Sequence, residues 1–248
     1  MIYYEVFGEG EPLIVLHSGG MSHEEWLPQI KVWEKRFKVI AIDQPGHGCS
    51  ALKGEKLSIS ECGHAVLEVM EKEGVTSAYF CGSSMGGATA LWVTMNRPER
   101  VKKLVLYRCN YRKNMATFRS TTSMSDPDYW ISLGVDRYLS RLHRGQGGDE
   151  AWKTVITRVS DALNPDTTDH DYRLSALETI ECPVMIVSGD RDPLVPMEDI
   201  IAMYQAIPTS SLWVLPHASH VTATNTWRAT IFAEEVERFL TRKRELTI

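Results

Sequence analysis

A serine lies between glycines in the segment Gly82–Gly87, which reads Gly-Ser-Ser-Met-Gly-Gly. The segment follows a short apolar run that predicts a strand and precedes a stretch that predicts a helix. A serine on so tight a strand-to-helix turn adopts an unfavourable backbone conformation, so the residues two before and two after it must lack bulk. Gly82 and Gly86 meet that need around Ser84, whereas centring the pattern on Ser83 would place bulkier residues there. The pattern predicts Ser84 as an exposed nucleophile.

Candidate acids and bases lie late in the chain. Asp190 and Asp192 follow one predicted strand, and His217 and His220 follow the next. In nucleophilic acyl transfer a histidine takes the proton of the serine, and a carboxylate orients the histidine. The chain order is serine, acid, histidine, each at the carboxyl end of a predicted strand. The residue types alone leave either aspartate and either histidine open.

The elements that must position these residues alternate along the chain. Short apolar, β-branched runs are typical of strands buried on both faces of a parallel sheet, and the alternation with helices predicts α/β architecture. The turn at residues 8–12 predicts that the first two strands form an antiparallel hairpin at one edge. The expected strands are Ile2–Phe7, Leu13–His17, Val39–Asp43, Ala78–Gly82, Leu104–Arg108, Val184–Gly189 and Leu212–Leu215. The expected helices cover about residues 23–35, 58–73, 85–96, 198–206 and 226–243.

One region interrupts the alternation. About 75 residues between Arg108 and Val184 contain no convincing strand but two helix-like segments, Asp126–Leu142 and Asp149–Leu163. A structureless loop of that length is unusual inside a compact domain, so the region predicts an inserted helical subdomain. The expected division is a core of residues 1–110 and 181–248, with a cap of residues 111–180.

Taken together, the motifs resemble the α/β-hydrolase fold family over essentially the whole chain. Leu16–Gly20 resembles the family's oxyanion-loop motif, and Asp43–Ser50 resembles its D-x-x-G-x-G-x-S turn. The insertion lies where members carry a helical cap. The resemblance implies a mostly parallel sheet flanked by helices. It implies about seven strands, since Met1 leads directly into the first predicted strand and leaves no room for the extra strand with which relatives often begin.

The resemblance also implies roles for single residues. Ser84 is the expected nucleophile. The family pattern G-x-x-D-x-x-x-P places the acid at Asp192, while Asp190 is the alternative and better fits a role in shaping the turn. Some relatives carry the acid after the preceding strand instead, but residues 109–125 contain no Asp or Glu. His220 is the expected base.

His217 is the alternative base, and the residue before His220 is Ser219, where relatives usually have Gly. By the same resemblance, the backbone N–H groups of Gly19 and Met85 form the oxyanion hole.

The expected activity is hydrolysis of a carboxylic ester or lactone of a small acyl substrate. The alternatives are C–C bond or thioester hydrolysis, a cofactor-free lyase or perhydrolase, and a non-catalytic binding module that retains the fold. A serine nucleophile disfavours the dehalogenase and epoxide-hydrolase chemistries that relatives run with a carboxylate. No dinucleotide fingerprint, P-loop or metal-ligand spacing is present in the sequence, so we expect no cofactor and no metal.

A basic run crosses the end of the fifth predicted strand. No acidic residue lies between Glu99 and Asp126. The basic residues Arg108, Arg112 and Lys113 all lie in this stretch. Open α/β sheets bind ligands at this edge, so one of these cations could meet a carboxylate or phosphate of the substrate. The alternative is a solvated basic surface. The candidate substrate contacts are Arg108, Arg112 and, from the insertion, Trp130.

Composition bounds the partners and the compartment. The chain of 248 residues has 27 Lys and Arg against 32 Asp and Glu, a net charge of −5. This balance disfavours nucleic-acid and anionic-membrane binding. The five scattered cysteines show no C-x-x-C pair, and neither a signal peptide nor a membrane-spanning run is visible. We therefore expect a cytoplasmic monomer or small homo-oligomer.

Overall fold

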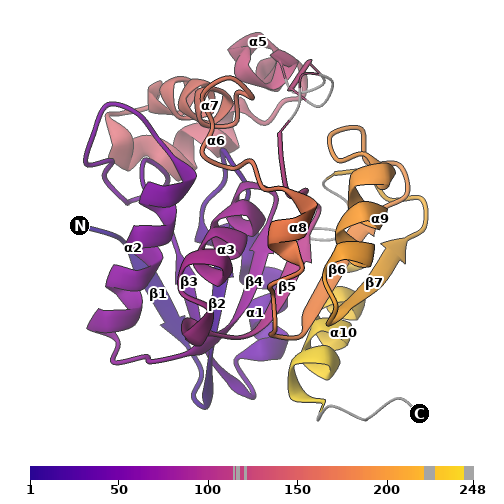
Figure 1. Cartoon of the computed structure of the whole chain (residues 1–248). Coiled ribbons are helices and arrows are strands. Elements are labelled where there is room, and N and C mark those ends of the chain that lie inside the picture. Colours follow the sequence, from indigo (N-terminus) through magenta and orange to yellow (C-terminus); the bar gives the residue numbers. More distant parts are fainter. Residues whose placement is uncertain (114, 116–117, 120–121, 221–226, 243–248) are drawn as a thin grey trace.

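A mixed β-sheet forms the centre of the computed structural model, which describes residues 1–248 except 114, 116–117, 120–121, 221–226 and 243–248 (Figure 1). The sheet has seven strands in the order β1-β3-β2-β4-β5-β6-β7. Only β1 runs antiparallel to its neighbour. The predicted α/β architecture with about seven strands is confirmed. The strands are β1 (Tyr4–Phe7), β2 (Glu11–Leu16), β3 (Phe37–Ile42), β4 (Ala78–Ser83), β5 (Val101–Tyr107), β6 (Val184–Gly189) and β7 (Ser210–Leu215).

The predicted hairpin between the first two strands is wrong. Strand β1 pairs with β3, with Tyr4 opposite Ile42, and β2 lies between β3 and β4. The last four residues of β2, Leu13–Leu16, have no exposed surface. A strand this apolar needs a neighbour on each side, whereas β1 is only partly buried and suits an edge.

Two hydrophobic cores cover the two faces of the sheet, because successive side chains of each strand alternate between them. One core takes Ile14 and Leu16 from β2, and the other takes Leu13 and Val15. The first is covered by α2 (Ile59–Lys72), α3 (Met85–Asn96) and α9 (Met197–Ala206). The second is covered by α1 (Leu27–Trp33), which follows the short helix η1 (His23–Trp26), and by α10 (Ala229–Thr241). Residues 226 and 243, the predicted ends of the last helix, lie outside the described residues.

The insertion between β5 and β6 is helical, and Figure 1 shows α5, α6 and α7 stacked above one end of the sheet. Its described elements are η3 (Thr122–Ser125), α5 (Pro127–Ser132), α6 (Asp136–His143), η4 (Arg144–Gln146), α7 (Ala151–Ala162) and α8 (Leu174–Leu177). Outside the insertion, a further short helix, η2 (Pro98–Arg100), precedes β5. The prediction of one helix over Asp126–Leu142 is wrong, because Gly134 has φ 68° between α5 and α6. A positive φ does not fit a right-handed helix.

The insertion packs partly on itself and partly on the core. Leu139, Trp152 and Ile156 form a small cluster of their own, while Leu177 of α8 joins the core of the sheet. The cap boundaries at 111 and 180 stay a prediction. No helix among the described residues has the length and apolar character needed to cross a membrane.

Candidate active site

The turn at Ser84 is held by close backbone contacts on both sides. Ser84 follows β4 directly and has φ 52° and ψ −113°, a strained conformation for a residue with a side chain. A Cβ on Gly82 would lie 2.3 Å from the carbonyl oxygen of Gly86, and one on Gly86 would lie 2.2 Å from that of Leu16. Both positions therefore require glycine, and the turn presents the Ser84 hydroxyl at the start of α3.

Three side chains from distant parts of the chain meet at this turn. His220 Nε2 lies 3.1 Å from Ser84 Oγ, and its Nδ1 lies 2.8 Å from Asp192 Oδ2. A carboxylate only accepts hydrogen bonds, so Nδ1 carries the proton and Nε2 is free to accept the hydroxyl proton of Ser84. The other carboxylate oxygen of Asp192 accepts from the N–H groups of Leu194 and Val195 at 2.8 and 3.2 Å, which fixes its orientation.

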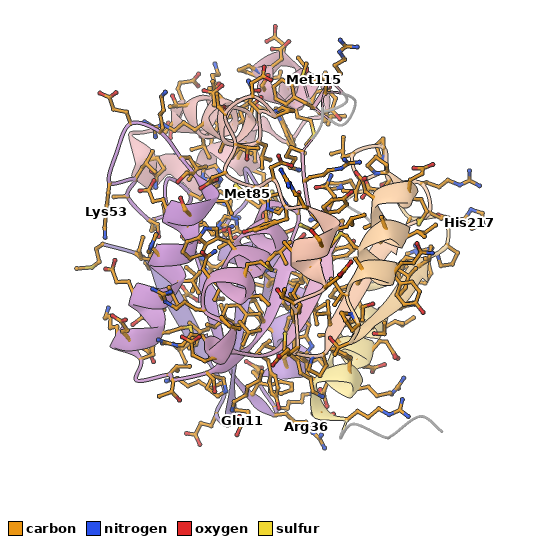
Figure 2. The ribbon with its side chains drawn as sticks, in the orientation of Figure 1. Glu11, Arg36, Lys53, Met85, Met115 and His217 are labelled. Atoms are coloured by element: carbon orange, nitrogen blue, oxygen red, sulfur yellow. The ribbon has the colours of Figure 1, made fainter. Side chains whose placement is uncertain are left out.

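The alternative acid and base lie elsewhere. Asp190 is exposed, and its side chain accepts a hydrogen bond of 3.1 Å from the N–H of Ala218, so it joins the two loops. Figure 2 shows His217 at the outer margin of the molecule, far from Met85, the residue that follows Ser84. The structure thus brings Asp192 and His220 to Ser84 and leaves the other pair apart.

Burial sets the protonation state of the candidate base. The pKa of His220 is lowered from its ordinary value because the ring is removed from water; the hydrogen bond with Asp192 opposes the shift only in part. The neutral ring, which can accept a proton, is therefore favoured at neutral pH.

A buried ion pair lies beside the three residues. Arg108, at the end of β5, has φ 46° and donates to the carboxylate of Glu25 and to the carbonyl oxygen of His220. Its Nε donates to Ser83 Oγ at 2.7 Å. The second oxygen of Glu25 accepts from the N–H and the hydroxyl of Ser18, at 2.6 and 2.9 Å. The pair thus ties together the loops around the site. Sequence reasoning missed Glu25, which carries no motif.

A cavity of about 440 Å³ opens above Ser84 and His220, under the insertion. Its upper wall is mostly apolar. Trp130 contributes to that wall, and its indole N–H donates to the carbonyl of Met124 at 2.6 Å. The residues that the insertion supplies are Lys113, Phe118, Met124, Ser125, Trp130, Leu133, Val135, Tyr138, Leu139, Ile156, Val159, Ser160 and Leu163.

The three candidate substrate contacts differ in where they lie. Trp130 and Arg108 line the cavity, but each Arg108 nitrogen already donates to a protein group. Arg112 does not line the cavity; its guanidinium is half exposed and lies 3.2 Å from Asp199. The neighbouring Lys113 is the residue that faces the cavity.

Comparison with known proteins identifies the family of the chain. A family model described as alpha/beta hydrolase fold matches residues 11–223. The chain belongs to the α/β-hydrolase family. As a member it is an enzyme, and its likeness to solved structures extends over nearly the whole chain. An enol-lactonase from Burkholderia xenovorans superposes with a TM-score of 0.75 at 23% identity, covering 97% of this chain and 96% of that one.

Two curated relatives are similar in sequence to this α/β-hydrolase. The (E)-2-((N-methylformamido)methylene)succinate hydrolase of Acinetobacter baylyi is 26% identical over 231 residues, which cover 88% of this chain and 86% of the relative. The 3-oxoadipate enol-lactonase 2 of the same organism is 25% identical over 238 residues, covering 88% and 85%.

In this α/β-hydrolase, two neutral histidines join helix α6 and the turn at residues 43–50 to the loop that follows β2. His143 of α6 accepts from the N–H of Gly48 through Nδ1 at 3.0 Å, and its Nε2 lies 2.9 Å from the carbonyl oxygen of Gly20. His47 Nε2 accepts from the N–H of Gly20 at 3.1 Å. Burial lowers the pKa of His143 to about 4 and that of His47 well below its ordinary value. Sequence reasoning found no partner for His143, because the partners lie about 100 residues away.

No three His, Cys, Asp or Glu side chains among the described residues gather in an arrangement that could hold a metal ion.

Proposed function

We propose that this α/β-hydrolase is a serine hydrolase that cleaves a carboxylic ester or lactone of a small acyl substrate. The observation that carries the proposal is the hydrogen-bonded series Ser84–His220–Asp192 at the floor of a largely apolar cavity. The size of the cavity suits a small molecule. The names of the relatives, a succinate-derivative hydrolase and an enol-lactonase, support the same reaction class.

The proposed reaction begins with attack of Ser84 Oγ on the acyl carbon. His220 Nε2 takes the hydroxyl proton, and Asp192 holds the ring in the correct tautomer and stabilises its charged form. The imidazolium then gives the proton to the leaving alkoxide. Water, activated by the same histidine, releases the acyl group from Ser84 and regenerates the enzyme.

Backbone N–H groups are the proposed partners of the oxyanion. Met85 is the first residue of α3, where a helix N–H has no partner within the helix and the helix dipole favours negative charge. Gly19 lines the cavity from the oxyanion loop. A Cβ on Gly19 would lie 2.4 Å from Val159 of the cap, so the cap leaves room for backbone alone at this point. One such donor typically contributes about 3 kcal/mol to stabilisation of the transition state.

Covalent labelling tests the proposal directly. We expect a fluorophosphonate to modify the protein once, at Ser84, as located by peptide mass spectrometry, and we expect steady turnover of short p-nitrophenyl esters or small lactones. Ser84→Ala should show neither reaction, while Ser83→Ala should still be labelled at Ser84. Absence of labelling and of turnover in the wild type would remove the proposal. Labelling together with turnover of only vinylogous diketones or thioesters would replace the ester by those bonds.

The lowered pKa of His220 predicts the shape of the pH profile. Activity requires the neutral ring, so a pKa below the ordinary 6.5 keeps the base competent into mild acid. We expect kcat/KM for a neutral ester to be flat through neutral pH and to fall with a midpoint below pH 6.5. Circular dichroism at each pH provides the control for unfolding. A midpoint above 6.5 in folded enzyme contradicts the prediction.

A further inference from the structure

Of the charged side chains that line the cavity, some form an ion pair and one does not. These side chains are Glu25, Arg108 and Lys113. Glu25 and Arg108 pair with each other and are almost fully buried. Among the residues that the structure describes, no carboxylate lies within the 4.0 Å ion-pair distance of the Lys113 ammonium. Among these described residues, Lys113 is thus the cation of the cavity wall that forms no ion pair.

The carboxylates nearest to Lys113 are committed to other groups. The charges that act on it are those of Asp192 and Asp199. Asp192 is held by His220 and by two backbone N–H groups, and Asp199 pairs with Arg112. Burial nevertheless lowers the pKa of Lys113 from its ordinary value, because its effect exceeds the opposing attraction of these carboxylates.

A partly buried ammonium that faces a cavity and forms no ion pair with a described carboxylate favours the binding of an anionic ligand. The ammonium is partly buried before binding, so an incoming carboxylate meets a partly desolvated charge beside apolar walls, where the attraction is stronger than in water. A structural lysine would be expected to form an ion pair or to extend into solvent. The single charge of an ammonium also matches the one negative charge of a carboxylate, whereas a phosphate monoester carries about −1.5 to −2 at pH 7.

We propose that Lys113 binds a carboxylate of the substrate, so that the ester or lactone hydrolysed at Ser84 carries a second, ionised acid group. The inference rests on the proposed function. It adds a substrate class: half-esters of dicarboxylic acids, lactones bearing a carboxylate, or esters whose alcohol part bears one. The apolar walls of the cavity would hold the carbon chain between the two ends.

Matched pairs of esters test the inference from both sides of the scissile bond. p-Nitrophenyl hemiglutarate against p-nitrophenyl butanoate places the charge on the acyl side. 4-Carboxyphenyl acetate against phenyl acetate places it on the leaving group. For at least one pair, Lys113→Met should lower kcat/KM for the anionic ester by about 10- to 100-fold, mostly through KM, the range of a charge-assisted hydrogen bond. The neutral ester of that pair should change less than about threefold.

Arg112→Gln is the matched control, because Arg112 is the adjacent cation and lies outside the cavity. It should leave both members of each pair unchanged. Lys113→Glu should lower turnover of the anionic ester further than Lys113→Met while sparing the neutral one, which separates charge from packing. Equal losses on the anionic and neutral esters in both pairs overturn the inference and leave the proposed function intact. Failure of the wild type to turn over any ester is instead a failure of the proposed function.

Inhibition of the wild type supplies a measurement that requires no variant to fold. With p-nitrophenyl butanoate as substrate, glutarate should inhibit competitively at a concentration at least tenfold lower than 1,5-pentanediol, its uncharged counterpart. Equal inhibition by the two compounds contradicts a carboxylate subsite. In folded Lys113→Met the preference for glutarate should disappear.

Discussion

Asp192→Asn should lower kcat for a p-nitrophenyl ester by about 10,000-fold, the loss that follows when the acid of a Ser-His-Asp triad is replaced by its amide. The amide would no longer hold His220 in the tautomer that leaves Nε2 free, and it would not stabilise the imidazolium formed during attack. The backbone N–H groups of Leu194 and Val195 that now donate to Asp192 can still donate to the amide oxygen. We therefore expect the variant to fold normally, with a melting temperature close to that of the wild type.

Asp190→Asn is the matched control. It makes the same chemical change two residues away, on an exposed side chain that accepts from the N–H of Ala218. Its kcat should stay within about fivefold of the wild type, since an amide oxygen also accepts that hydrogen bond. A larger loss in Asp190→Asn than in Asp192→Asn would assign the acid to the other residue.

Arg108→Met should lower the free energy of unfolding by about 3–5 kcal/mol, the cost of removing one partner from a buried ion pair. The change leaves the carboxylate of Glu25 buried without its cation. It also removes the donors to Ser83 Oγ and to the carbonyl oxygen of His220. The measurement is urea unfolding followed by fluorescence, with the slope compared to ensure that the transition is the same.

Two comparisons separate the ion pair from other effects. Arg112→Met removes a half-exposed pair with Asp199 and should cost no more than about 1 kcal/mol. The double variant Glu25→Gln, Arg108→Met removes both buried charges and should be more stable than Arg108→Met alone. If Arg108→Met keeps wild-type stability and instead raises KM only for anionic esters, Arg108 binds the substrate and does not hold the loops.

The sequence was sufficient to predict those features that require a local pattern of residue types. The glycines around Ser84 are required because backbone atoms lie where their Cβ atoms would be, and that requirement is visible in the chain itself. The apolar runs likewise predict the strands, because strands buried on both faces have few alternatives. The predicted hairpin is wrong because the turn between β1 and β2 reverses the chain without deciding which strand pairs with β1.

Long-range partners could not be predicted in the same way. Glu25 and Arg108 are 83 residues apart, and neither belongs to a motif that names the other. Residues 108–113, which follow β5, form no helix, so no periodicity predicts that Lys113 faces the cavity while Arg112 faces Asp199. The choice between these adjacent cations, which matters most for the substrate, required the structure.

The three residues of the site lie far apart in the sequence, which affects how activity is lost on unfolding and regained on refolding. Ser84 and His220 are 136 residues apart, and Asp192 and His220 both follow strands at one side of the sheet, β6 and β7. A partly unfolded form that has lost only those two strands would retain the nucleophile turn but have no base. Turnover therefore reports docking of about the last quarter of the chain, which begins at β6. Activity would be lost whenever that region opens and regained only once it has docked again.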